Sequence, residues 1–257
     1  MNINVQTKIN QLLQKVPRGG LFLSSWMVAN GISRELQRHY RRSQWLTPIG
    51  TGVMVRTGDN YSLFGALASL NEQDKKHFAI GALSALEING FSHYLPMGKK
   101  TVVVFSPKSE RLPAWFLKRD WNVILRHFTT EFLDAEIGME TVLQEGFNIS
   151  VSSTARAFLE CLHLSPQYYN PTDLYYVMET LSLLSPLQVQ ALLEDCKSVK
   201  VKRLFIFMAE KAGHDWLKML DLSKISLGTG KRSIVKNGVY NTKYQITIPK
   251  ELANDTE

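Results

Sequence analysis

Apolar side chains recur at helical spacing in the first sixteen residues of the chain. Separations of four, three and four positions place four of them on one stripe of a helix over 4–16: Val5, Ile9, Leu12 and Val16. Pro17 and the two glycines that follow it shortly afterwards end this helix, because neither residue type continues a helix well. The apolar run over 21–23 then predicts a short strand.

Two further helices are predicted before the chain reaches residue 45. The first runs over 26–29, with Ser24 or Ser25 as its N-cap, since a serine hydroxyl accepts a hydrogen bond from a free amide of the first turn. The second runs over 34–43, and Ser33 is its predicted N-cap.

The helix predicted over 34–43 has two chemically different faces. Leu36 and Tyr40 are four positions apart and are expected to pack inward together with Ile32. The opposite face carries polar and basic side chains at spacings of three, one and three: Arg34, Gln37, Arg38 and Arg41. With Arg42, four arginines fall within nine residues, and such like charges oppose helix stability unless an anion lies nearby.

A two-stranded wing is predicted directly after this helix. Segments 45–48 and 53–56 have strand character and flank a glycine-bracketed turn at 50–52, with Thr51 near its tip. Helix, short strand, two helices and a hairpin within about sixty residues is the order of a winged helix-turn-helix domain, which we place at residues 1–58.

The excess positive charge of the chain is concentrated in the same segment. The chain has 30 basic and 23 acidic residues, and residues 1–56 contain eight of the basic residues but only one acidic residue, Glu35. The remaining 201 residues contain 22 of each and are neutral overall. A basic segment attached to a neutral body is typical of proteins that bind a polyanion. A solubilising surface is the alternative explanation.

Together these features predict binding to double-stranded DNA. The forked donors of Arg and Gln match base edges in the major groove, so Arg34, Gln37 and Arg38 are the candidates for base contacts. Phosphate contacts are assigned to four other side chains: Arg18, Arg41, Arg42 and Arg56. Ser33 and Thr51 complete the predicted DNA-binding set. A winged helix used only for protein contacts is the alternative.

Residues 59–257 predict a larger mixed domain, so the expected fold class is α+β. Helices are expected at 63–70, at 78–88, from Ser152 or Ser153 onward, and through 171–222 with breaks near 185 and 213. Strands are expected at 100–105, 121–128, 145–151, 231–236 and 244–249.

Two basic clusters lie in this body. Lys231, Arg232 and Lys236 form a possible second anion patch that would touch DNA or a protein partner. The other cluster is expected to be a solvated helix face: Lys197, Lys200, Lys202 and Arg203.

The residues predict no catalytic site, metal or cofactor. A phosphate-binding loop around Gly230 and Lys231 fails on spacing, because Ile225 stands where the first glycine is required and Arg232 where Ser or Thr is required. The six histidines are scattered without zinc-ligand spacing. We therefore expect that the protein is not an enzyme.

Composition and hydropathy also predict where the protein acts. No apolar stretch approaches the roughly 18 residues that a membrane-spanning helix needs. The N-terminus lacks the apolar core of a signal peptide, and the chain has only two cysteines. We expect a cytoplasmic protein that contacts no membrane.

Several segments of the body resemble one known family, the AbiEi antitoxins of type IV toxin–antitoxin systems involved in abortive infection. The resemblance rests on the winged-helix segment and on four sequence blocks: SALEINGFSHYLP with KKTVVVF, SSTARAFLECL, KVKRLFIFMAEKAGHDWL and LGTGKRSIVKNGVYNTKYQITIP. Their order along the chain, more than any single block, carries the resemblance.

The resemblance implies a function for each part of the chain. The N-terminal domain would bind inverted-repeat operator DNA and repress its own operon, as part of phage defence. The C-terminal domain would counteract a nucleotidyltransferase-like toxin, in many such pairs without a stable complex. The alternatives are a winged-helix regulator without a toxin, whose body senses a ligand or oligomerises, and a nucleic-acid-processing enzyme.

Overall fold

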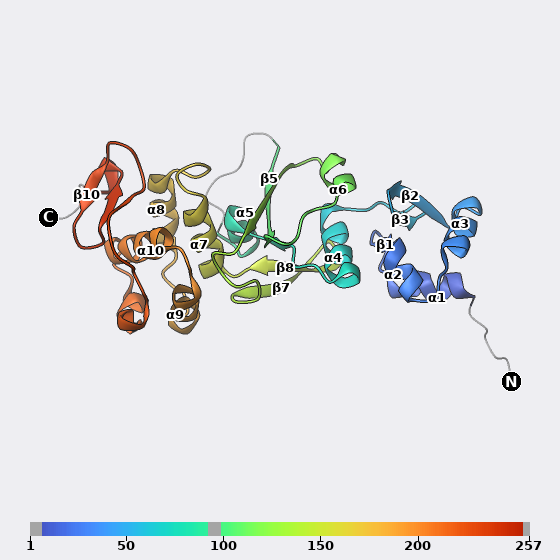
Figure 1. The fold of residues 1–257 in the computed structure, drawn as a ribbon, viewed down its shortest axis with the longest axis horizontal. Coiled ribbons are helices and arrows are strands. Elements are labelled where there is room, and N and C mark those ends of the chain that lie inside the picture. Colours follow the sequence, from blue (N-terminus) through green and yellow to red (C-terminus); the bar gives the residue numbers. More distant parts are fainter. Residues whose placement is uncertain (1–6, 92–98, 254–257) are drawn as a thin grey trace.

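The fold is known from a computed structural model that describes residues 7–91 and 99–253. Figure 1 shows an elongated molecule with the first elements of the chain at one end, a sheet in the middle, and the last elements at the other end. The structure is a mixed α+β fold, as predicted. Val5 and the part of the SALEINGFSHYLP block beyond Phe91 lie outside the described residues.

The N-terminal elements follow the predicted order of a winged helix. They are α1 (Lys8–Lys15), β1 (Leu21–Leu23), α2 (Ser24–Ala29), α3 (Arg34–Arg42), β2 (Leu46–Gly50) and β3 (Val53–Arg56). The strands form an antiparallel sheet in the order β1-β3-β2, and β2 and β3 make the wing. Gly52 supports the wing turn with a φ of 73°, a conformation that favours glycine.

One local prediction in this domain is wrong. α2 begins at Ser24 itself, and neither Ser24 nor Ser25 caps it with a side-chain hydrogen bond. The Ser24 hydroxyl instead donates to the side chain of Gln37 on α3. Ser33 is confirmed as the N-cap of α3, because its hydroxyl accepts a hydrogen bond from the Leu36 amide.

The centre of the molecule is a five-stranded sheet in the order β6-β5-β4-β8-β7. Its strands are β4 (Ala79–Ile80), β5 (Thr101–Pro107), β6 (Ile124–Thr130), β7 (Met139–Gln144) and β8 (Phe147–Ser152). β5 is parallel to β6 and β4 is parallel to β8, whereas the β4–β5 and β7–β8 pairs are antiparallel. The predicted helix over 78–88 is therefore wrong at its start, which is β4, and β7 was not predicted.

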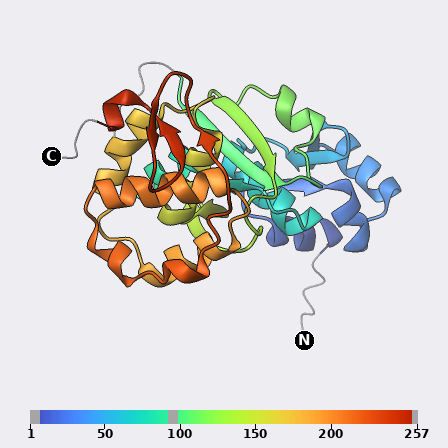
Figure 2. The same cartoon turned by 60° about the vertical axis from the view of Figure 1, so that its left-hand side comes forward.

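Helices surround this sheet and fill the C-terminal half. They are α4 (Leu63–Asp74), α5 (Ala82–Ile88), α6 (Ala114–Lys118), α7 (Thr154–Leu164), α8 (Pro171–Thr180), α9 (Pro186–Asp195) and α10 (Val199–Lys211). In Figures 1 and 2, α7 to α10 lie together on the side of the sheet away from the winged domain. Short 3-10 helices follow at Asp215–Met219, Leu222–Lys224 and Lys250–Leu252. A second sheet contains β9 (Arg232–Ser233), β10 (Val239–Asn241) and β11 (Ile246–Ile248).

The basic run on α10 is not the solvated face that the sequence predicts. Lys202 and Arg203 are buried, and Lys200 is half-buried. The Arg203 guanidinium donates hydrogen bonds to four backbone carbonyls, those of Leu227, Gly228, Gly230 and Gln245. Arg203 therefore holds the C-terminal glycine-containing segment against α10, which gives the LGTG block a structural role.

The winged domain and the body share a packed junction. The peptide groups at the free edge of β1 are paired by side chains of α4: the Leu21 amide donates to Ser69 Oγ at 2.8 Å, and the Leu23 amide donates to Gln73 Oε1 at 2.9 Å. One face of the small sheet, including Val53 and Val55, belongs to the core of the body. The winged domain is thus fixed to the body through α4, a helix that begins after the domain boundary predicted at residue 58.

Candidate nucleic-acid interface

The candidate interface is built on α3 and the wing. Ser33 caps the start of α3. Ile32, just before the helix, and Tyr40, near its end, are both buried in a separate apolar core of the winged domain. Burial raises the pKa of the Tyr40 hydroxyl. The arginines lie on the outward face of α3.

Four arginines of α3 point to solvent. Arg34, Arg38, Arg41 and Arg42 are all exposed, and among the described residues no carboxylate lies within ion-pair distance of any of them. Glu35 is the single acid on the helix. Desolvating unpaired guanidinium groups is unfavourable unless an anion replaces the water, so this face is suited to a polyanionic surface.

Gln37 does not belong to that exposed face. Its side chain is only 3% exposed. Its Oε1 accepts a hydrogen bond from Ser24 Oγ at 2.6 Å, and its Nε2 donates to the carbonyls of Ser24 at 3.1 Å and Ile32 at 3.0 Å. Gln37 and Tyr40 are three positions apart and share the inward stripe. The assignment of Gln37 to a base edge is therefore corrected: it joins α2 to α3.

Arg56 is also occupied inside the domain. Its guanidinium Nη2 donates to the Leu13 carbonyl at 2.7 Å, near the end of α1, and its Nε lies 3.8 Å from Asp59. The side chain is 20% exposed, compared with 82% for Arg18, which lies 3.7 Å from the same Asp59 carboxylate. Arg56 is removed from the phosphate-contacting set, and Arg18 remains in it.

The wing contributes an exposed edge beside α3. Thr51 is exposed in the turn between β2 and β3, where the Ser24 amide donates to the Gly52 carbonyl at 2.8 Å. Trp45 lies between α3 and β2 and is 46% exposed. Trp45 is not among the DNA-binding residues predicted above; its position directly after the arginine-bearing helix is the sequence signal that points to it.

The second predicted patch lies far from α3. Lys231, Arg232 and Lys236 are all exposed, and the Lys231 amino group lies 4.9 Å from the centroid of the Tyr240 ring. Figure 1 places this C-terminal sheet and α3 at opposite ends of the long axis. The two basic surfaces therefore do not combine into one interface.

Comparison with known sequences assigns both parts of the chain. Residues 5–97 match the sequence model of the AbiEi antitoxin N-terminal domain, a transcriptional regulator, and residues 99–249 match that of the transcriptional regulator and AbiEi antitoxin of type IV toxin–antitoxin systems. The chain belongs to the AbiEi family. The resemblance noted from the sequence blocks is confirmed, and this AbiEi protein has an antitoxin and regulator role.

Structural comparison shows the same fold elsewhere. The crystal structure of the RV2827C protein from Mycobacterium tuberculosis is similar with a TM-score of 0.59 and 14% sequence identity, over 95% of this chain and 92% of that chain. At this identity the similarity concerns the fold alone. No match was found in the comparison with curated proteins.

Two other kinds of site are absent from the described residues. No group of three or more His, Cys, Asp or Glu side chains is arranged to hold a metal ion in the described part of the chain. Within 7–91 and 99–253, every helix is too short or too polar to cross a membrane.

Proposed function

We propose that this AbiEi protein binds inverted-repeat operator DNA upstream of its own operon and represses that operon. In the proposal, its body counteracts a nucleotidyltransferase-like toxin in the cytoplasm. The body acts by binding a partner and does not catalyse a reaction. One observation carries the DNA-binding part: four exposed arginines without acidic partners cover the outer face of α3, next to the wing.

The proposal gives each side chain a role in the complex. α3 enters the major groove, where Arg34 and Arg38, four positions apart on one face, donate to guanine edges. Arg41, Arg42 and Arg18 contact phosphates on either side of the groove. Ser33 at the helix start and Thr51 at the wing lie near the sugar-phosphate backbone of the DNA. Trp45 packs against a deoxyribose of that backbone.

The first test is binding of the full chain to the DNA upstream of its own gene, with scrambled DNA of the same length as control, over a series of salt concentrations. Three phosphate contacts from each of two copies on an inverted repeat predict a loss of about 10³ in affinity between about 50 and 200 mM salt. Preference for the upstream DNA with that slope supports a specific repressor. Equal binding to both DNAs contradicts specificity, and no binding contradicts the DNA interface.

Variants then separate base contacts from phosphate contacts. Arg38→Ala should cost about 1–3 kcal/mol on operator DNA and relax specificity at one base pair, because a forked donor pair is lost. Arg42→Ala should weaken binding to all sequences alike. Arg111→Ala is the matched control, since this arginine is exposed but lies between β5 and α6, outside the winged domain. Equal operator binding by all three variants would show that α3 is not the recognition helix.

The antitoxin part is tested separately from DNA binding. We propose that Lys231, Arg232 and Lys236 form a protein- or nucleic-acid-facing patch used in countering the toxin, because this patch lies away from α3. Full-length chains carrying Lys231→Glu with Lys236→Glu should still bind operator DNA but fail to restore growth of cells that express the adjacent toxin gene. Restored growth with this double variant would remove the patch from the antitoxin function.

A further inference from the structure

A small pocket opens at the carboxyl ends of the parallel strands β5 and β6. It has a volume of about 210 Å³ and is bordered by Ser106 and Pro107 of β5, Thr130 of β6, Arg156 of α7 and Lys197, which follows α9. The carboxyl ends of parallel strands are where open sheets with covering helices place their ligand sites. A pocket of this size is below the roughly 300 Å³ at which sites for larger ligands begin.

Arg156 is the central group of this pocket. Its side chain is only 4% exposed. Its Nε donates to Glu160 Oε1 at 3.0 Å, and its Nη1 donates to the carbonyls of Asp134 at 2.6 Å and Ile137 at 2.5 Å. Among the described residues, its remaining nitrogen, Nη2, has no hydrogen-bond partner, although the residue borders the pocket. The two N–H groups of Nη2 are thus available to a ligand.

The Arg156 guanidinium is held rigidly in this position. The Glu160 carboxylate is fully buried and also accepts hydrogen bonds from the Ala82 amide and from Ser152 Oγ, both at 2.9 Å. The guanidinium therefore loses little further freedom when a ligand binds, which favours affinity.

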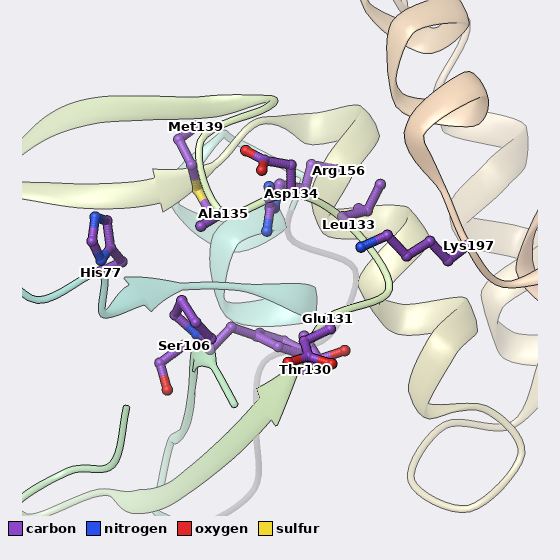
Figure 3. A pocket seen from close by; sticks show the side chains of 12 residues that line it. His77, Ser106, Thr130, Glu131, Leu133, Asp134, Ala135, Met139, Arg156 and Lys197 are labelled. Carbon is purple, nitrogen blue, oxygen red and sulfur yellow. Dashed lines mark hydrogen bonds between the residues drawn. The ribbon is translucent and has the colours of Figure 1, made fainter. Parts of the chain in front are cut away.

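Two more donors face the same space. Figure 3 shows the Lys197 amino group extending towards the space below Arg156. This amino group has no ion-pair partner in the described parts of the chain, and its backbone is fixed by a 2.8 Å hydrogen bond from the Lys197 amide to the Phe132 carbonyl. Thr130 Oγ1 accepts a hydrogen bond from the Phe132 amide at 3.3 Å, so its own O–H is free to donate.

Two carboxylates also border the pocket, and each has one partner outside the donor set. Glu131 lies 3.1 Å from the Lys108 amino group, and Asp134 Oδ1 accepts a hydrogen bond from the Glu136 amide at 2.9 Å. The donors of Arg156, Lys197 and Thr130, two of them on cationic side chains, therefore remain available to an anion. We propose that this pocket binds a phosphate-type oxyanion, either free phosphate or the phosphoryl group of a mononucleotide, through Arg156, Lys197 and Thr130.

The experiment is calorimetric titration of the full chain with inorganic phosphate and, separately, with AMP, at constant ionic strength. A dissociation constant of about 0.1–1 mM is expected for such a site. Lys197→Ala and Thr130→Val should each weaken binding, the lysine variant by about tenfold, because a charge-assisted hydrogen bond is lost. Lys218→Ala, which alters an exposed lysine paired with Asp215 outside the pocket, is the matched control and should bind as the parent does.

The two ligands distinguish the sources of the anion. Equal affinity for phosphate and AMP supports a site for the free oxyanion, whereas at least tenfold tighter binding of AMP supports a mononucleotide. Absence of saturable binding of both ligands up to about 20 mM would overturn the proposal, since that concentration far exceeds the expected constant. Binding that Lys197→Ala and Thr130→Val leave unchanged would also overturn it. Circular dichroism of each variant confirms that it is folded.

Discussion

Gln37→Ala is expected to destabilise the winged domain without removing a DNA contact. The Gln37 side chain makes three hydrogen bonds, one to Ser24 Oγ and two to the carbonyls of Ser24 and Ile32. At about 0.5–1.5 kcal/mol for each buried bond, their loss lowers the free energy of unfolding by roughly 1.5–4.5 kcal/mol. The upper part of this range applies if water cannot enter to satisfy the two carbonyls.

The measurement combines urea unfolding with operator binding at a temperature where the variant is still folded. We expect a lower unfolding free energy for Gln37→Ala and unchanged discrimination between operator base pairs. Arg38→Ala, one position along the same helix but exposed, should show the reverse: normal stability and relaxed discrimination. If Gln37→Ala keeps full stability but tolerates a changed base pair, the inward placement of Gln37 is refuted and the original base-contact assignment is restored.

Three further predictions concern the body and its junction with the winged domain. Gln73→Ala should lower the unfolding free energy by about 1–3 kcal/mol, because the Leu23 amide at the edge of β1 loses its partner; chemical denaturation measures this. Arg203→Ala should lower it by about 3 kcal/mol or more and speed tryptic cleavage after Lys231, whereas Arg232→Ala should not change stability. Acid should also destabilise the protein: burial and the charge of Lys200 lower the pKa of His163, so the folded state favours the neutral ring. The contribution of neutral His163 to folding stability is complete above the unfolded pKa of 6.5 and is lost as the pH falls towards the lower pKa of the folded state. A His163→Phe variant should therefore show a smaller decrease in melting temperature than the parent between pH 7.5 and 5.5.

Local signals located most of the elements correctly. Ser33 and Ser153 cap α3 and α7, and Pro171 and Pro186 stand at the first position of α8 and α9, as the residue types predict. β7 was missed because it is an edge strand without a buried residue, and its apolar residues, Met139, Val142 and Leu143, do not alternate regularly with polar ones. Its identity depends on pairing with β8, which a local pattern does not contain.

The candidate site was predictable only in part, for the same reason. The arginines of α3 could be found from charge and spacing, since an exposed side chain depends little on its surroundings. Gln37 and Arg56 could not be assigned, because the carbonyls of Ser24, Ile32 and Leu13 that hold them come from other elements.

The sequence by itself determined the order of the winged-helix elements, the concentration of positive charge in the first 56 residues and membership of the AbiEi family. These properties depend on neighbouring residues and on composition. Only the tertiary structure decided which polar and basic side chains face solvent and which are held by buried carbonyls, as Arg203 is. It also decided that Arg156 and Lys197 meet at one pocket. A hydrogen bond to a distant backbone group requires the chain to be folded, and no local spacing encodes it.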